Sequence, residues 1–150
     1  MRHGKVLGIC VVATALWLGG RSSAQFPSPA DRNATQAGRC GLADLRGTYG
    51  FARTGETPQG PLAAVGVAQF DGEGNSTVAQ STNRNGTLSQ GSFALTYDVF
   101  PDCRGVWYDA SGAVSAHFVL VDGGNELFFL SLGAGNTIAG QSKRIAPLNR

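Results

Sequence analysis

The sequence predicts an all-β protein, a small antiparallel up-and-down barrel of about eight strands. After Gly47 there is no apolar stripe at helical spacing. Short apolar or alternating runs follow one another instead, separated by Gly, Asn, Asp and Pro, which is typical of strands joined by turns. Because parallel strands need long crossovers, the short links between these runs predict consecutive antiparallel hairpins.

The expected strands follow one another along the chain. They are Thr48–Thr54, Pro61–Phe70, Ser76–Thr82, Leu88–Val99, Gly105–Ala110, Ala113–Val121, Glu126–Leu132 and Thr137–Arg144. Such a meander leaves two exposed edges unless it closes on itself, and a barrel removes both. The 22 glycines suit the sharp bends of a barrel. A flat sandwich is the alternative, although it usually needs longer links between its sheets.

The first 24 residues have the pattern of a secretory signal peptide. Arg2 and Lys5 precede the apolar run Val6–Gly20, which is too short for a spanning helix, and small residues follow at Ser22 and Ala24. Cleavage after Ala24 predicts a secreted or periplasmic protein with no membrane span in the mature chain. An uncleaved membrane anchor is the alternative.

Removal of residues 1–24 changes the charge balance. Three of the 12 basic residues leave, and the remaining nine stand against 10 acidic ones. With no basic run left, the mature chain is not expected to bind nucleic acid or an anionic membrane surface. Residues 25–39 are polar and predict a flexible leader, and residues 40–150 predict a single β-barrel domain.

Two cysteines remain after residue 24, Cys40 and Cys103, and they predict one disulfide. It would close a loop of about 64 residues and stabilise the fold by roughly 4 kcal/mol on the chain-entropy model. A pair of metal or redox thiols is disfavoured, because there is no CxxC and one histidine remains. We therefore expect no metal site and no cofactor.

Four segments form an ordered series, "GTYGF" at Gly47–Phe51, "GPLAAVGVAQFDGEGN" at Gly60–Asn75, "NGT…G" at Asn85–Gly91 and "YDVFPDCRG" at Tyr97–Gly105. The series resembles uncharacterised small secreted β-barrel proteins of bacteria, and in architecture it is similar to calycin and allene-oxide-cyclase barrels. The resemblance implies a barrel. Calycins bind small apolar molecules inside theirs, whereas cyclase barrels fold a reactive chain inside. No catalytic motif of either group is present, so a shared function would be an analogy from fold.

Alternation along the strands gives a candidate interior. An eight-stranded barrel is just wide enough to fill with side chains or to hold one small ligand. Small residues on the second strand, at Ala64, Gly66 and Ala68, would leave room for a ligand. The candidate ligand-binding residues are the aromatic ones, Tyr49, Phe51, Phe93, Tyr97, Trp107, Phe118 and Phe129. A solid core made of the same residues is the alternative.

Asp109, after Trp107 and Tyr108, is the candidate catalytic residue. If Trp107 and Asp109 point inward, apolar surroundings would raise the Asp109 pKa and make it an acid or base. If they point outward, Asp109 is a solvated residue leading into a turn. His117 lies between apolar neighbours and, without a nucleophile motif, indicates an ordinary surface or hydrogen-bonded residue.

"DGEGN" at Asp71–Asn75 invites comparison with a calcium loop. An EF-hand needs Gly at its sixth position and Glu at its twelfth, whereas this chain has Ser76 and Thr82 there. Hairpin turn chemistry explains the motif, since Asp, Asn and Gly tolerate positive φ. A metal site at this loop is the alternative.

Three functions stay open. The first is a non-catalytic module that binds a small apolar or amphipathic ligand in the barrel. The second is a cyclase or isomerase, which would need an inward polar pair such as Asp109 with Tyr97 or Tyr108. The third is a structural or adhesive envelope protein, which would show an exposed apolar patch or a self-pairing edge. The sequence does not indicate the oligomeric state.

Overall fold

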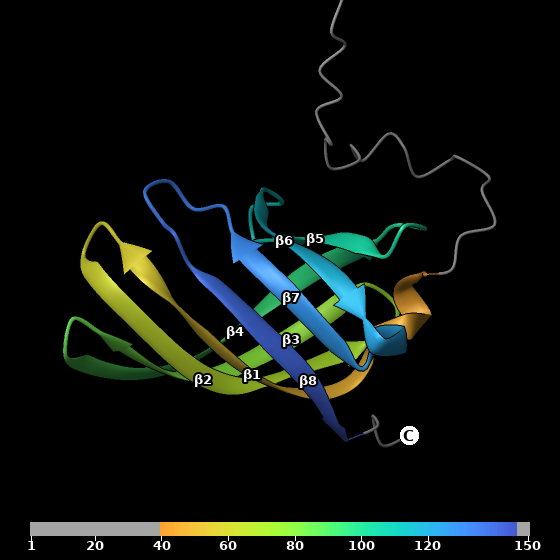
Figure 1. Cartoon of the computed structure of the whole chain (residues 1–150), viewed down its shortest axis with the longest axis horizontal. Coiled ribbons are helices and arrows are strands. Elements are labelled where there is room, and N and C mark those ends of the chain that lie inside the picture. The colour runs from red at the N-terminus through yellow and green to blue at the C-terminus, as the bar shows by residue number, and fades with distance from the viewer. Residues whose placement is uncertain (1–39, 147–150) are drawn as a thin grey trace, which may run out of the picture.

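The computed structural model describes residues 40–146 and shows an eight-stranded closed antiparallel barrel (Figure 1). This confirms the predicted fold class. The strands are β1 (Arg46–Thr57), β2 (Gly60–Asp71), β3 (Asn75–Arg84), β4 (Thr87–Val99), β5 (Arg104–Tyr108), β6 (Val114–Val121), β7 (Glu126–Ser131) and β8 (Ala139–Ala146). Two short 3-10 helices, η2 (Leu42–Asp44) and η3 (Asp122–Gly124), complete the described elements. The predicted signal peptide and leader, residues 1–39, lie outside the described residues.

Every strand pairs with its neighbours in the sequence, and β1 closes the barrel on β8. The closing ladder runs from Thr54 opposite Ala139 to Thr48 opposite Ala146, with an irregularity between Thr48 and Tyr49. With β1 paired on both sides, the meander has no free end strand, which is why the chain forms a barrel rather than a sandwich.

The hairpins turn where the sequence offers residues that tolerate positive φ. Between β3 and β4, Asn85 and Gly86 have φ of 48° and 85°, as a two-residue hairpin turn requires. In the "DGEGN" turn, the Asp71 carboxylate accepts hydrogen bonds from the backbone N–H of Glu73 at 2.7 Å and of Asn75 at 3.0 Å. The loop therefore reverses the chain through an Asx-type turn.

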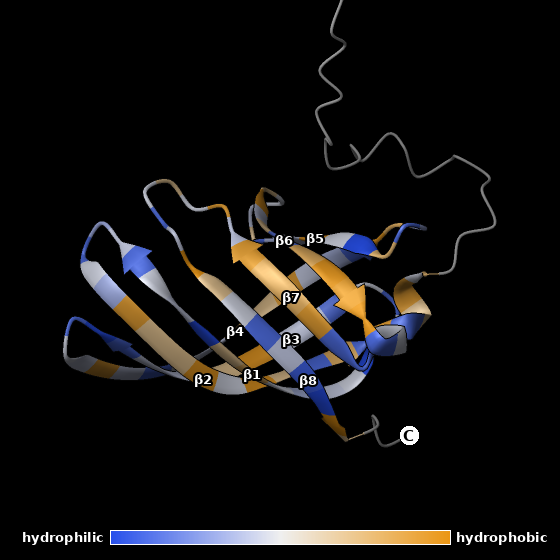
Figure 2. Ribbon diagram, in the orientation of Figure 1, coloured by the Kyte–Doolittle hydropathy of each residue, from blue (hydrophilic) through white to orange (hydrophobic). Residues whose placement is uncertain are grey.

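One face of each strand points into the barrel and forms its core. The buried cluster comprises Leu45, Tyr49, Ala68, Phe70, Val78, Tyr97, Trp107, Ala116, Phe118, Leu120 and Leu127. Close packing of the core requires glycine at residue 105, because a Cβ on Gly105 would overlap the ring of Phe118. Along the chain, β6 and β7 are mostly apolar, whereas β8, the neighbour of β7, is mostly polar (Figure 2).

Aromatic hydroxyls and the disulfide seal one end of the barrel, which we call the closed end. The buried Tyr97 hydroxyl donates to the Leu45 carbonyl at 2.9 Å and accepts from the Gly72 N–H at 3.0 Å. The predicted partners Cys40 and Cys103 lie at disulfide distance, with Cα atoms 5.0 Å apart. The segment that carries η2 is thus fixed to the barrel.

A second network at the closed end joins the first strand to the last. The Tyr49 hydroxyl, fully buried, donates to the carbonyl of Gly124. Arg144 on β8 donates to the same hydroxyl from Nε at 3.0 Å and from Nη2 at 2.8 Å, and Nη2 also donates to the Asp44 carbonyl at 2.8 Å. The guanidinium therefore bridges β1, η2 and η3.

The strands differ in length at the other end, which we call the open end. β4 has 13 residues and β5 has five, and only Thr96–Val99 of β4 pair with β5. Residues 87–95 pair with β3 alone. Figure 1 shows the β1–β2 and β3–β4 hairpins extending past the shorter strands. The wall of the barrel is therefore lower on the β5 side.

Among residues 40–146, no helix has the length and apolar character needed to cross a membrane.

Candidate functional site

An internal cavity of about 180 Å³ lies between the core and the open end. Its lining is Phe51, Arg53, Ala68, Phe70, Ser76, Val78, Gln80, Phe93, Leu95, Trp107, Ser115, Ala116, Phe129, Ser131 and Ser142. An apolar cavity of about 150 Å³ is large enough to take a benzene molecule. The space therefore suits one aromatic ring or a short alkyl chain.

Trp107 is the centre of the aromatic wall. Its ring lies 4.8 Å from that of Phe118 and 5.3 Å from that of Phe129, between centroids, and it stacks with Phe70 at 6.2 Å. These neighbours hold the indole in one orientation, because tilted and edge-to-face contacts are the favoured arrangements of aromatic pairs. The wall is therefore preorganised.

Two buried side-chain nitrogens of the described part of the chain have no hydrogen-bond partner there, Trp107 Nε1 and Arg53 Nε. Both residues line this cavity. Buried donors without an acceptor are uncommon, because each costs about 1–3 kcal/mol. Because both nitrogens belong to residues that line the same cavity, a hydrogen-bond acceptor bound there would stabilise the fold.

Arg53 and Gln80 stand where the apolar cavity passes into a polar mouth. Arg53 Nη2 donates to Gln80 Oε1 at 2.8 Å. Both residues also line a second hollow of about 430 Å³ at the open end, with Gln59, Thr82, Arg84, Asn85, Thr87 and Ser89. The interior therefore changes from aromatic to polar at this pair.

The mouth is positively charged. Two of its lining residues are the arginines Arg53 and Arg84, and none of the residues that line the cavity or the mouth is acidic. Burial lowers the pKa of Arg53, and the nearby charge of Arg84 lowers it further. Both effects mean that the Arg53 charge is held at a cost in this position.

The seven aromatic residues proposed from sequence divide into two groups. Phe51, Phe93, Trp107 and Phe129 line the cavity. Tyr49, Tyr97 and Phe118 are buried in the core, the two tyrosines with their hydroxyls bound at the closed end. Sequence reasoning missed Arg53 and Gln80. Arg53 could have been found from the alternation of β1, because it lies two residues after Phe51 and four after Tyr49 and so shares their inward face.

Asp109 lies in the exposed turn after β5. Its carboxylate accepts from the Ser111 hydroxyl and N–H and from the Ala113 N–H, and the hydrogen bond from the Ser111 side chain is the main cause of its lowered pKa. Tyr108 donates instead to Asp98, at 2.9 Å. A lowered pKa makes Asp109 a weak base at neutral pH, and the carboxylate has the environment of a turn residue.

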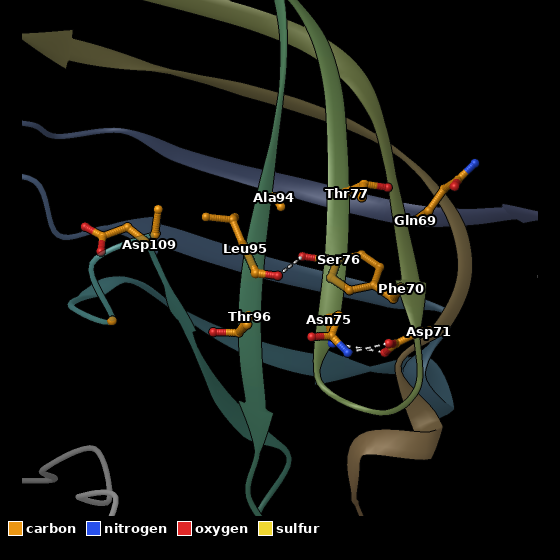
Figure 3. A pocket seen from close by; sticks show the side chains of 12 residues that line it. Gln69, Phe70, Asp71, Asn75, Ser76, Thr77, Ala94, Leu95, Thr96 and Asp109 are labelled. Carbon is orange, nitrogen blue, oxygen red and sulfur yellow. Dashed lines mark hydrogen bonds between the residues drawn. The ribbon is translucent and has the colours of Figure 1, made fainter.

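A third hollow, of about 550 Å³, lies beside β4 and brings Asp109 near the "DGEGN" turn. Figure 3 shows Asp109 and Asp71 on opposite sides of β4, with Asn75 bonded to Asp71 and Ser76 to the Leu95 carbonyl. Partial burial raises the Asp71 pKa, but hydrogen bonds from Asn75 and the turn backbone lower it more. Turn contacts thus engage both carboxylates.

Within residues 40–146, no group of three or more His, Cys, Asp or Glu side chains could hold a metal ion. His117 lies on β6 opposite Val106 and Leu130, half-buried. Burial lowers its pKa, and the charge of Arg104 lowers it further.

Two solved structures share the general barrel form. A de novo designed fluorescence-activating β barrel is 14% identical with a TM-score of 0.41, over 69% of this chain and 97% of its own. The S-type phycobiliprotein lyase CPES from Guillardia theta is 8% identical with a TM-score of 0.39, over 73% of this chain and 92% of its own. No family model and no curated protein matches the chain.

Proposed function

We propose that this protein binds a small apolar or amphipathic molecule in the internal cavity of its barrel. The observation that carries the proposal is the buried indole N–H of Trp107, which lacks an acceptor in a cavity walled by Phe51, Phe93 and Phe129. A bound aromatic ring would bury apolar surface there and accept a hydrogen bond from the indole on its π face.

The test is a titration with the neutral probe 3-phenylpropan-1-ol, followed by NMR. The indole N–H signal of Trp107, the one tryptophan of the predicted mature chain 25–150, should shift and saturate. A probe of this size should bind with a Kd of about 0.1–1 mM. No saturable shift at Trp107, with either this alcohol or the corresponding acid, would refute the proposal.

A matched pair of variants locates the binding. Ala68→Leu places extra carbon atoms into the cavity and should abolish the shift. Ala63→Leu makes the same change on the exposed face of the same strand and should leave it intact. Equal binding by both variants would place the probe elsewhere.

Surface association is a second candidate, favoured by one observation. Four large apolar side chains on and beside β6 and β7 have exposed fractions of 37–49%, Val119, Phe128, Leu130 and, just after β7, Leu132. Exposed apolar patches mark association surfaces in soluble proteins. Sedimentation of the protein and of Leu130→Asp decides the point. A concentration-dependent dimer abolished by the variant supports an adhesive role, and a monomer at all concentrations excludes self-association.

A further inference from the structure

Arg53 is an inward-facing charge in the wall of the barrel. On β1 it stands opposite Ala64 of β2 and Gly140 of β8. A Cβ on Gly140 would lie 2.7 Å from the Arg53 Cβ and would overlap the Phe129 ring, so glycine makes room for both side chains. The local packing therefore accommodates the arginine beside the aromatic wall.

The guanidinium is held on one side and has a free donor. Nη2 donates to Gln80 Oε1, whereas the buried Nε–H has no acceptor among the described residues. Guanidinium groups bind carboxylates through two parallel N–H donors, and such paired, charge-assisted bonds are about twice as strong as neutral ones. Gln80 therefore orients the Arg53 guanidinium, and its N–H donors are in place to bind an anion.

The charges around Arg53 also favour an anionic ligand. Burying one charge without a partner is costly, and a bound anion would offset that cost. Arg84 adds a second positive group at the mouth, and the lining of mouth and cavity contains no carboxylate that could act as the partner. A neutral polar group would leave the guanidinium uncompensated.

We propose that the ligand is a small amphipathic carboxylate, whose carboxylate pairs with Arg53 at the mouth while its aryl or short alkyl group fills the cavity beside Trp107. This inference rests on the proposed function. The order of the lining, aromatic below and cationic above, sets the direction in which the molecule enters. The cavity volume of about 180 Å³ limits the apolar part to about one ring or a short chain.

The experiment compares two probes that differ only at the polar end, 3-phenylpropionate and 3-phenylpropan-1-ol. Calorimetric titration at neutral pH should show the carboxylate binding roughly 10- to 100-fold tighter, as expected for a hydrogen-bonded charge pair. The advantage should shrink as salt is raised, because the mouth is open to solvent. Equal affinities would overturn the inference and leave the proposed function standing.

Variants assign the preference to one side chain. Arg53→Gln should remove the higher affinity for the carboxylate and change the affinity for the alcohol by less than about threefold. Arg53→Lys should keep part of the preference for the carboxylate, because lysine retains the charge but lacks the paired N–H donors. Arg46→Gln, on the exposed start of β1, is the control and should change neither. Loss of both probes in Arg53→Gln, with the alcohol still bound by Arg53→Lys, would show a packing role and contradict the inference. Failure of the native protein to bind either probe refutes the proposed function itself.

Discussion

Replacing Tyr49 by Phe should weaken the closed end of the barrel without changing its shape. The phenyl ring would keep the edge contact with Phe70, 5.2 Å between centroids, and its place 5.4 Å below the Arg144 guanidinium. What is lost is the hydroxyl, which donates to Gly124 and accepts from two nitrogens of Arg144. The substitution therefore isolates the hydrogen bonds from the packing.

The magnitude follows from which groups lose a partner. Arg144 Nη2 keeps the Asp44 carbonyl at 2.8 Å and the Gly124 carbonyl at 3.2 Å, so it stays satisfied. Its Nε loses the Tyr49 hydroxyl. One buried neutral bond and one partly buried bond to a charged group are worth together about 2–4 kcal/mol. At about 2 kcal/mol per molar urea, the midpoint of unfolding should fall by about 1.5 M.

Equilibrium urea unfolding measures this, and a double-mutant cycle with Arg144→Lys apportions it. The two changes should be less than additive by about 1 kcal/mol or more, because both act on one network. A loss of under about 0.5 kcal/mol in Tyr49→Phe, or additive changes in the cycle, would refute the reasoning.

Three further predictions concern the same barrel. Burial raises the pKa of Tyr97 to about 12. The stabilisation of the fold by the neutral Tyr97 hydroxyl is therefore full below pH 10, the pKa of an exposed tyrosine, and is lost as the pH rises towards 12. Urea titrations should show this fall in the free energy of unfolding, and a smaller fall in Tyr97→Phe. Gly105→Ala should lower the free energy of unfolding by about 1–3 kcal/mol, whereas Gly91→Ala, where an added Cβ meets nothing within 4 Å, should not; equal thermal midpoints would contradict this. Replacing Cys40 and Cys103 together by Ser should cost about 4 kcal/mol, and a reductant should then have no further effect on the urea midpoint.

The order of the strands was predictable because turns are local. Asn85 with Gly86, and Asp71 with its following glycines, specify hairpins from a few adjacent residues. The residues at which strands end were harder to predict from the sequence. β1 runs to Thr57 rather than Thr54, through Gly55, where a Cβ would overlap the backbone of Thr137. That contact joins residues far apart in the chain, so local propensity does not reveal it.

Only half of the candidate site could be predicted from the sequence, for a similar reason. Aromatic residues at strand spacing indicate an inward face, whereas a charge such as Arg53 is expected outside the barrel. Its partner Gln80 lies 27 residues away, and the hydrogen bond exists only once β1, β2 and β3 are in register. Asp109 lies one residue past the end of β5 and in the turn, so the strand alternation from which its direction would be read has ended at Tyr108.

The unequal lengths of β4 and β5 have a consequence for how fast a guest could be exchanged. Because residues 87–95 form no ladder with β5, that flank of the wall is an interrupted seam. Movement of residues 87–95 away from β5 would break no ladder hydrogen bonds, because these residues pair with β3 alone. Exchange through the seam would thus be a matter of hairpin motion, on the nanosecond-to-microsecond scale of loops, and would be uncoupled from the slow opening of the barrel.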